Sequence, residues 1–533
     1  MNYRRATLPS AILIACAAAP VVHAQALPAL PVLPANTASG AEPQAVEAPP
    51  TTYLAPSVAV LGMSTSNANF GNGSPPRSDT ILNIVPRLVV ASDHAHWHLR
   101  GDFSLYGLYY LRGTLGNEIL PSGSVNLRSE LVDRFVYFDA GIQSQQNVIN
   151  PYVGQFSGPS SNQYTTTQYR VSPYIDRLIT PDLRFIARSD DTWTKTNNIP
   201  INTGIYGGRY TVQTVSLDQR PVRLGYTLLA RQTETTYDNE AEASLKESSF
   251  RAIGNYALSD RLILGLIGGY EKVQAFLASE SKPIYGVRGH WQPNAFGRVD
   301  ATLEHRYFGT GWNLQAVGGS PLLNLSANWT RGPTTYLAAL ANGANPGGNI
   351  ASLVDGMLLS QYPDPVSRAQ AVQNLLNSSG LPASLATSNN FFTASANLQN
   401  ALSLTALMLR ERNTYALTLY RVKTEDLFLP GQALLQAIQT LSTDNIQTGA
   451  ALNFGRRLTP IDNVNFTVVR ANNSGFGPNQ GQSSRQTSFM IQLDHGFSPH
   501  TTGVIGLRRQ FLVSTAVPNT NESAIYIGAI HRF

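Results

Sequence analysis

The chain has 533 residues, of which 42% are hydrophobic and only 13% are charged. Soluble domains carry roughly 25% charged residues, so this protein is unusually poor in charge. The 23 Tyr, 20 Phe and 5 Trp argue against a disordered chain, and a net charge of +5 gives no support for nucleic-acid binding. After residue 24 no apolar run reaches the roughly 18 residues that a transmembrane helix needs, which excludes a helical membrane protein.

Residues 1–24 have the organisation of an N-terminal signal peptide for export. A basic pair at residues 4–5 precedes an apolar stretch at residues 11–19, and Val-His-Ala at residues 22–24 is a small-x-small cleavage site. Cys16, the only cysteine, is removed by this cleavage, which suits an oxidising cell envelope. The sequence Leu-Ile-Ala-Cys that ends at Cys16 also resembles a lipobox, so lipidation of Cys16 is the alternative.

Residues 25–55 are rich in Pro and Ala and cannot bury a core, so we expect an extended periplasmic leader there. The folded part is expected to occupy residues 56–533. It begins where the sequence changes to a period of two, which is typical of β-strands.

Alternation is clearest near the C-terminus and recurs along the chain. Val464, Phe466 and Val468 alternate with Asn463, Asn465 and Thr467. Residues 222–231, 262–270 and 298–307 repeat an apolar face opposite a polar or charged face. Strands of about 10–14 residues are long enough to cross a bilayer at a tilt. Because an open sheet edge in lipid leaves backbone groups unpaired, we predict a closed β-barrel.

The connections between these strands alternate between short turns and longer loops. This is expected when turns face the periplasm and loops face the cell exterior. The count predicts an all-β, transmembrane, antiparallel up-and-down barrel of about 22 strands, within a range of 18–24. Together with the export signal, it places the protein in the outer membrane of a Gram-negative cell.

One connection, residues 332–390, is long enough to hold structure of its own. The segments Ile350–Gln361 and Asp364–Asn377 are predicted helices, with Asp364 as N-cap, Pro365 in the first turn and Gly380 after the end. The second helix carries an apolar stripe formed by Val366, Ala369, Val372, Leu375 and Leu376. Strand counting makes this an extracellular loop, and two placements stay open: packing on the barrel rim, or folding back into the lumen as a constriction. We favour partial occlusion at the extracellular mouth. A further short helix is predicted from Pro430 to Leu441.

The chain ends on an aromatic residue, Phe533, with Gly528 five positions earlier. This pattern resembles the signal that the barrel-assembly machinery recognises. That machinery and outer-membrane lipid are therefore expected partners.

The charged residues of the polar strand faces are the candidate lining of the lumen. They are Arg223, Arg231, Arg298, Asp300, Glu304 and Arg306. Lipid-facing charges cost roughly 2–4 kcal/mol at the bilayer midplane, so these side chains are expected to face inward. Two interpretations remain: neighbouring charges neutralise one another and stiffen the wall, or they line a conduit for a hydrated, anionic glycan.

Two other clusters contain residue types that are found in metal sites or in hydrolase active sites. His94, His96 and His98 follow Asp93 at a turn, where two imidazoles on one face could share a metal. Polar turn residues explain them equally well. Asp494 and His495 lie near Ser498, as in hydrolases, but without a nucleophile elbow. We predict no catalytic residue, no metal site and no cofactor, and expect that the protein is not an enzyme.

Four segments together resemble a family of outer-membrane proteins associated with PEP-CTERM/exosortase exopolysaccharide systems. They are Gln168–Tyr174; Tyr362–Pro365 through Arg368, with Leu375-Leu376 and Gly380–Pro382; Arg412–Leu419; and Leu493–Pro499, with Gly503 and Leu507–Arg509. None is a catalytic motif. The resemblance implies an outer-membrane barrel in polysaccharide-producing bacteria and supplies no mechanism.

The leading hypothesis is a non-enzymatic, porin-like barrel that serves envelope or exopolysaccharide export as a channel or scaffold. Exopolysaccharide or its export proteins are the expected partners, and nucleic acid is not. The first alternative is a surface receptor or adhesin that uses the long loop. The second alternative is a membrane-embedded hydrolase.

Overall fold

The computed structural model describes residues 52–533 apart from a set of connecting segments. The segments outside the described part are residues 72–74, 154–161, 198–206, 239–243, 276–277, 295, 321, 343–349, 359–364, 380–395 and 428–443. The signal segment and most of the leader, residues 1–51, and the helix predicted from Pro430 to Leu441 also lie outside it.

The described residues form 22 strands in one sheet, three α-helices and one 3-10 turn. The first eleven strands are β1 (Thr52–Thr65), β2 (Asp79–Asp93), β3 (Trp97–Tyr110), β4 (Glu118–Val132), β5 (Val136–Val148), β6 (Gln163–Thr180), β7 (Leu183–Asn197), β8 (Gly208–Gln219), β9 (Leu224–Tyr237), β10 (Leu245–Ser259) and β11 (Leu262–Ala275). The others are β12 (Ala278–Asn294), β13 (Gly297–Arg306), β14 (Gly309–Ser320), β15 (Leu323–Thr334), β16 (Asn397–Leu409), β17 (Asn413–Asp426), β18 (Asn445–Arg457), β19 (Asp462–Gly475), β20 (Ser483–Gly496), β21 (Thr501–Ser514) and β22 (Thr520–Arg532). The helices are α1 (Tyr336–Ala341), α2 (Ile350–Leu358) and α3 (Pro365–Ser379), and the 3-10 turn is η2 (Gly477–Asn479).

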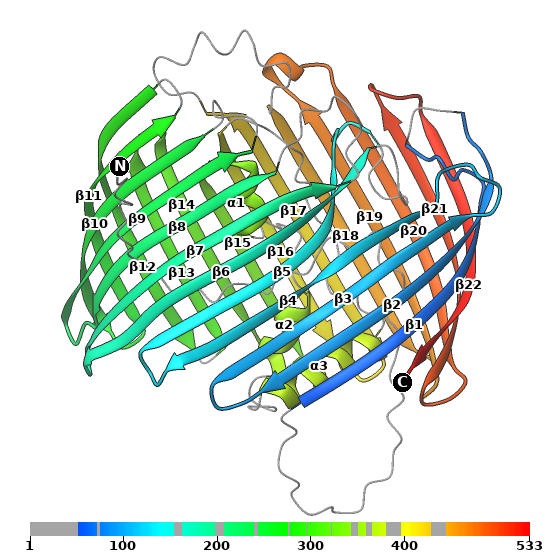
Figure 1. Ribbon diagram of the computed structural model, residues 1–533, viewed down its shortest axis with the longest axis horizontal. Coiled ribbons are helices and arrows are strands. Elements are labelled where there is room, and N and C mark those ends of the chain that lie inside the picture. The colour runs from blue at the N-terminus through cyan, green and yellow to red at the C-terminus, as the bar shows by residue number, and fades with distance from the viewer. Residues whose placement is uncertain are drawn as a thin grey trace, which may run out of the picture.

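The sheet is a closed up-and-down barrel (Figure 1). Neighbours in sequence pair antiparallel, and β22 pairs with β1 from Ser57 opposite Arg532 to Thr65 opposite Ala524. The predicted all-β, antiparallel barrel of about 22 strands is confirmed. Within the described ranges, none of the helices is long and apolar enough to cross a bilayer. The first strand begins at Thr52, four residues before the expected start of the barrel at 56.

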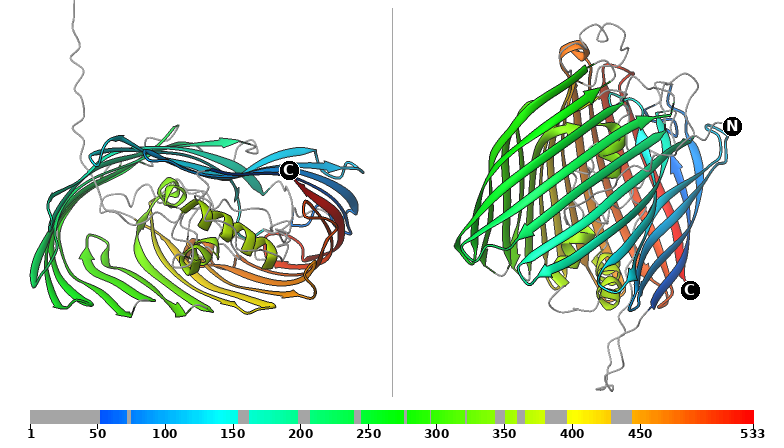
Figure 2. Two further views of the ribbon diagram at one scale, coloured as in Figure 1. Left: turned by 90° about the horizontal axis from the view of Figure 1, so that it is seen from below. Right: turned by 60° about the vertical axis from the view of Figure 1, so that its left-hand side comes forward.

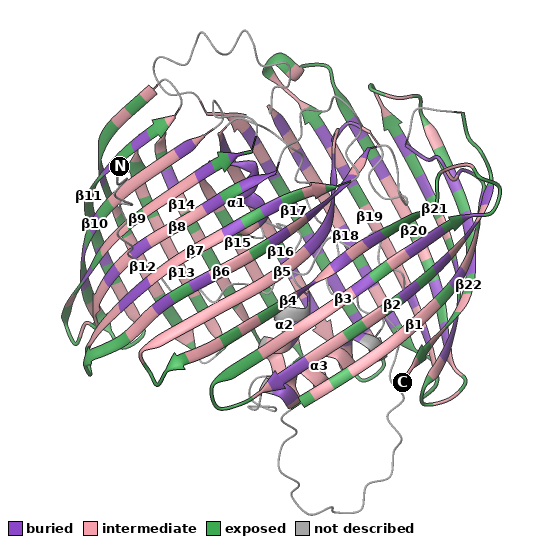
Figure 3. Cartoon of the chain, in the orientation of Figure 1, coloured by how far each residue is buried: buried purple, intermediate pink, exposed green. Residues whose placement is uncertain are grey.

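Successive side chains along each strand point to opposite faces of the wall, as the pleat requires. Large apolar side chains lie on the outer face, and Leu224 and Leu266 are 75% and 72% exposed there. On β19, Phe466 faces outward, whereas Asn465 is buried inside and donates to Asp494. Figure 3 shows the resulting alternation of buried and exposed residues along the strands. An outer surface this apolar indicates burial in hydrocarbon.

The two ends of the barrel differ in their connections. Ten short turns, from residues 94–96 to residues 497–500, lie at the end where β1 begins and β22 ends. The opposite end carries most of the long connections, the longest being residues 335–396. Because short turns face the periplasm in outer-membrane barrels, we call the first end periplasmic and the second extracellular. Two extracellular connections, β11–β12 and β13–β14, are only two residues long.

The barrel is flattened, so that two broad walls face each other across the lumen (Figure 2). A sharp bend joins the walls near β10–β13, where the backbones approach closely. A side-chain Cβ at Gly269 or at Gly286 would lie 2.2 Å from a carbonyl oxygen of the adjacent strand, so only glycine fits at these positions.

The terminal residue, Phe533, makes few contacts in the finished barrel. Its ring is 72% exposed and packs on His531, and its N–H donates to the Pro56 carbonyl at 3.1 Å. Deleting Phe533 is therefore expected to lower insertion in cells and to leave the protein degraded in the periplasm, with little change in the stability of barrels that do assemble. Surface levels measured by protease accessibility provide the test. Normal levels of the truncated protein would refute the assignment of Gly528 and Phe533 to the assembly signal.

Candidate functional site

The long connection between β15 and β16 folds into the lumen. Its first helix, α1, begins after Thr335, whose hydroxyl accepts from the Ala338 N–H at 3.2 Å. The helix crosses to the opposite wall, and Tyr336, Leu337 and Leu340 pack there on a group of inward-facing tyrosines. These are Tyr164 of β6, Tyr210 of β8 and Tyr237 of β9. A hydrogen bond of 2.9 Å between Thr335 and Thr235 fixes the same contact.

The helices α2 and α3 lie deeper, at the periplasmic end of the lumen (Figures 1 and 2). Arg368 of α3 donates to Asp355 of α2 at 2.9 Å, which joins the two helices. Together they pack on Leu407 and Ala416, which flank the periplasmic turn between β16 and β17. The buried residues of this cluster are Ile350, Leu353, Val354, Val372, Leu376, Leu407 and Ala416. The inner face of the wall is apolar at this point because α2 and α3 pack on it.

Of the two placements open for the predicted helices, the structure shows folding into the lumen. The start of α3 at Pro365 agrees with the prediction, and Val366, Val372 and Leu376 of the apolar stripe are buried. The depth differs from our expectation of occlusion at the extracellular mouth, because α2 and α3 reach the other end. The proposed capping residues Asp364 and Gly380 lie outside the described residues.

An ion pair on the wall also contacts the insert. Arg87 of β2 binds Asp102 of β3 with two hydrogen bonds of 2.8 and 2.6 Å. The same guanidinium reaches Gln373 of α3 at 3.4 Å. Besides β2, α3 contacts β1 and β18. The insert therefore rests on both broad walls at once.

A second segment crosses the lumen at the extracellular end. Beyond the pair Gly123–Ser144, β5 no longer pairs with β4, and residues 145–148 pair with β6 alone. The connection that follows reaches the opposite wall. There the Pro151 carbonyl accepts from Asn473 at 2.8 Å and from Ser484 at 3.0 Å. The Tyr152 carbonyl accepts from Ser514 at 2.6 Å.

The composition of the β5–β6 hairpin explains this path. Ser144, Gln145, Asn147, Thr165 and Thr166 are all buried, although they point to both faces of the hairpin. A hairpin that is polar on both faces cannot lie in lipid. It turns inward instead, where amides and hydroxyls satisfy one another.

The contact of this connection with the far wall is tight. A Cβ at Gly475 would lie 2.2 Å from the Asn479 carbonyl oxygen and 2.8 Å from the Tyr152 hydroxyl, so only glycine fits there. Burial, together with the charge of Asp444, raises the pKa of Tyr152 to about 12. The phenol is therefore neutral over the physiological pH range.

The lumen beside the insert contains a cavity of about 600 Å³ at the periplasmic end. It is lined by residues of β6–β13 and their turns, including Arg184, Asp218, Arg288, His290 and Asp300. Arg288 donates to two neutral side chains, Asn255 and Thr227, at 2.9 Å each. Asp218, which also lines the cavity, interacts electrostatically with Arg288 and offsets part of its positive charge.

Four of the predicted lumen residues lie in ion pairs on the inner face of β13. Glu304 accepts from Arg251 of β10 at 2.8 and 3.0 Å, a pair that spans the sharp bend. Arg306 donates to Glu271 of β11 at 2.8 and 2.6 Å. Asp300 accepts from His290 at 2.7 Å and from Arg298 at 2.5 Å. Such pairing matches the interpretation in which neighbouring charges neutralise one another and stiffen the wall.

The two predicted residues near β9 differ from each other. Arg231 faces the lumen and hydrogen-bonds Tyr210, next to α1. Arg223 does not line the wall: it lies exposed in the turn before β9, where its carbonyl accepts from the Ala257 N–H at 2.8 Å. The strand begins at Leu224, two residues later than the alternation that starts at residue 222, because the turn opened by Pro221, which has no N–H for the ladder, extends to Arg223.

Sequence reasoning missed the ion pairs of β5–β7. Asp190 accepts from Arg170 at 2.7 Å and from Arg188 at 2.9 Å, and Arg188 also reaches Asp139 at 2.9 Å. The charges of Arg184, Arg188 and Asp190, which share one face of β7, are the available signal. Ile186 stands between them on the same face and hides the alternation.

The two candidate clusters, His94–His98 and Asp494–Ser498, do not form a metal site or a hydrolase site. In the described part of the chain, no group of three or more His, Cys, Asp or Glu side chains is arranged to hold a metal. His98 pairs with Asp93, and His96 lies 3.6 Å from Asp133. Asp494 points inward to Gln492 and Asn465, whereas His495, the next residue, faces outward and contacts Asp462. Adjacent strand residues on opposite faces cannot act as a catalytic pair.

Comparison with known proteins finds only distant structural similarities. No protein-family model matches the sequence, and neither does any curated protein. The siderophore receptor PirA from Acinetobacter baumannii is 10% identical over 90% of this chain and 80% of its own, with a TM-score of 0.43. The FrpB iron transporter from Neisseria meningitidis is 9% identical over 89% and 82%, with a TM-score of 0.43. OccK5 (OpdH) from Pseudomonas aeruginosa is 9% identical over 90% and 98%, with a TM-score of 0.31. Similarities this low do not indicate a shared substrate.

Proposed function

We propose that this protein is a non-enzymatic outer-membrane channel for hydrated polar solutes, narrowed by the insert between β15 and β16. The observation that carries the proposal is the polar cavity of about 600 Å³ that lies beside the insert, on the β6–β13 side of the lumen. Charged and amide groups on the inner wall offer hydrogen bonds to a passing solute, as in other selective pores. The apolar outer face supplies the membrane-embedded surface.

Arg288 supplies one of the positive charges of the cavity lining, which also contains Arg184, Arg220, Asp182, Asp218 and Asp300. Asp300 is held by His290 and Arg298, whereas Arg288 contacts only neutral side chains. A charge 7 Å from an ion in water-filled space contributes about 0.6 kcal/mol, or nearly threefold in relative permeability. Arg288→Gln is therefore expected to lower the chloride-to-potassium permeability ratio about threefold, as measured from reversal potentials in a KCl gradient.

The matched control is Arg456→Gln, which removes the same charge from the exposed periplasmic end of β18. It should leave the permeability ratio unchanged. An Arg288→Gln channel with the wild-type ratio would remove Arg288 from the path. A purified protein that gives no ohmic conductance at all would reject the channel itself.

For the transported material, we propose an anionic exopolysaccharide. The support is the resemblance of four sequence segments to barrels of polysaccharide-producing systems, together with the positive charge of Arg288 in the cavity lining. A soluble polyuronate should then block the current reversibly, and neutral dextran of the same length should not. Absence of block by either polymer would leave a channel with another solute.

The surface receptor or adhesin alternative required the long loop to lie outside the barrel. The described helices of that loop lie in the lumen instead, on Tyr164 and Tyr237 at one level and on Leu407 at another. No specific contact favours this alternative.

A further inference from the structure

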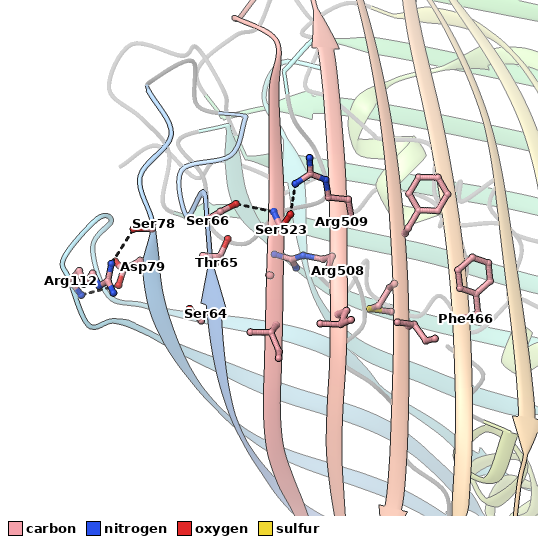
Figure 4. Close-up of a pocket in the computed structure, with 16 residues that line it drawn as sticks. Ser64, Thr65, Ser66, Ser78, Asp79, Arg112, Phe466, Arg508, Arg509 and Ser523 are labelled. Carbon is pink, nitrogen blue, oxygen red and sulfur yellow. Dashed lines mark hydrogen bonds between the residues drawn. The ribbon is translucent and has the colours of Figure 1, made fainter.

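A groove of about 710 Å³ lies on the outer face of the barrel, on strands β19–β22 and the adjoining β1, and Ser78, Asp79 and Arg112 form its far rim (Figure 4). Its lower part is apolar: Phe489, Ile491, Leu507 and Ile525 face outward and are 40–54% exposed. Its upper part, toward the extracellular end, is polar and contains Arg509. An apolar surface below a polar rim has the profile of one lipid molecule, with acyl chains below and a headgroup above.

Arg509 is held in place at the junction of these two parts. Its guanidinium donates to the Ser523 hydroxyl on β22 and lies 4.8 Å from the centre of the Phe511 ring. Figure 4 shows Arg509 beside Ser523, and Arg112 beside Ser78 on the far rim. The hydroxyl of Ser523 and the ring of Phe511 are uncharged, so these two contacts do not neutralise the positive charge of Arg509.

Two further arginines stand next to this groove on the outer face. Arg470 of β19 lies opposite Thr487, and Arg485 of β20 lies opposite Asn472. The two arginines are thus diagonal neighbours, whose side chains start about 7–8 Å apart. Arg509 of β21 lies opposite Phe489 of β20. Phe489 is two residues nearer the periplasmic end than Thr487, the residue opposite Arg470.

These outward arginines lack counter-charges on the protein. Within the described chain, the side chains of Arg470 and Arg485 form no hydrogen bond or ion pair, and both are exposed. The carboxylates of the neighbouring strands face the lumen: Glu522 binds Arg508, and Asp494 binds Gln492. In the described extracellular halves of β18–β22, no acidic side chain faces outward.

An unpaired charge on the lipid-facing side requires an anion from the surroundings. Lipid-facing arginine costs roughly 2–4 kcal/mol at the midplane and little near the headgroups, and it gains from bidentate contact with phosphate. The side chains of Arg470, Arg485 and Arg509 all start in the extracellular halves of their strands, with Arg470 and Arg509 close to the middle. Long arginine side chains near a membrane interface extend toward the headgroups.

We propose that Arg470, Arg485 and Arg509 bind the phosphate groups of one anionic glycolipid of the outer leaflet, whose acyl chains lie in the groove formed by Phe489, Ile491, Leu507 and Ile525. The three charges are spread over neighbouring strands, which suits a headgroup that carries more than one phosphate. This site lies outside the lumen and is independent of the proposed conduction.

Native mass spectrometry of the full-length protein in neutral detergent, titrated with diphosphoryl lipid A, tests the site. Wild-type protein is expected to retain one lipid. The variant Arg470→Gln/Arg485→Gln/Arg509→Gln should lose affinity about tenfold or more, the factor expected when even one charge-assisted hydrogen bond is lost. Dephosphorylated lipid A should bind wild-type protein as weakly as the intact lipid binds the variant.

A matched variant, Arg410→Gln/Arg456→Gln/Arg457→Gln, removes three exposed arginines from the periplasmic end and should bind like wild type. Inorganic phosphate at the concentration of the lipid should not compete. The proposal is overturned if the first triple variant, shown to be folded by heat-modifiable migration, binds as tightly as wild type. Equal binding of the dephosphorylated lipid, an equal loss in the matched variant, or full competition by inorganic phosphate would overturn it as well.

Discussion

Replacement of residues 340–388 by a short Gly/Ser linker is expected to raise single-channel conductance severalfold. The change removes α2 and α3, which occupy the lumen at its periplasmic end. Conductance grows with the open cross-section, and the wall left behind is complete, because strand pairing on both sides of the insert is independent of it. Planar-bilayer recordings of both proteins under the same salt give the comparison.

Heat-modifiable migration must first show that the shortened protein still assembles. A second variant, Val354→Asp/Leu376→Asp, keeps the chain length and places two charges in the buried cluster between helices and wall. It should loosen the insert, so that the current fluctuates between the conductance of the wild-type protein and that of the shortened protein. Identical, steady conductance in all three proteins would defeat the assignment of the insert as the constriction.

Phe466→Arg is expected to impair membrane assembly far more than Asn465→Arg. Phe466 faces lipid at the centre of the outward apolar run Val464, Phe466 and Val468 of β19, where an arginine costs roughly 2–4 kcal/mol. Asn465 faces inward and lies 3.1 Å from the Asp494 carboxylate, which would pair with the new guanidinium. The folded fraction of each variant can be read from heat-modifiable migration after expression in cells. Equal folded fractions would mean that the faces of β19 are assigned the wrong way round.

The wall of this barrel follows from sequence because each strand obeys the same local rule. The face in contact with lipid must be apolar, and the pleat places every second residue on the opposite, lumenal face. The faces of Phe466 and Asn465 can therefore be assigned without knowledge of any neighbouring strand. The ten short turns mark the strand ends, as in the sequence around Ser259 and Asp260. The prediction that Arg223 lines the lumen is wrong because a small error in the start of β9 moves this side chain from the lumen to a turn.

The contents of the lumen follow from sequence only in part, because they depend on contacts between distant residues. The apolar stripe of α3 predicts burial but not its partner, Leu407 of β16, thirty residues and more away. The signal lies in β16 itself, whose Leu407 and Leu409 add apolar side chains to the inner face. The polar hairpin at residues 144–147 gives a second signal, since it is apolar on neither face and cannot remain in the wall.

The contacts of α3 with β1, β2 and β18 bear on the order in which the protein is built. These strands come from opposite ends of the chain, and they must be brought together before β22 can pair with β1. An insert that contacts all three adds interactions next to a seam between strands more than four hundred residues apart. Closing so long a stretch of chain costs conformational entropy, and the contacts of α3 offset part of that cost in the closed barrel.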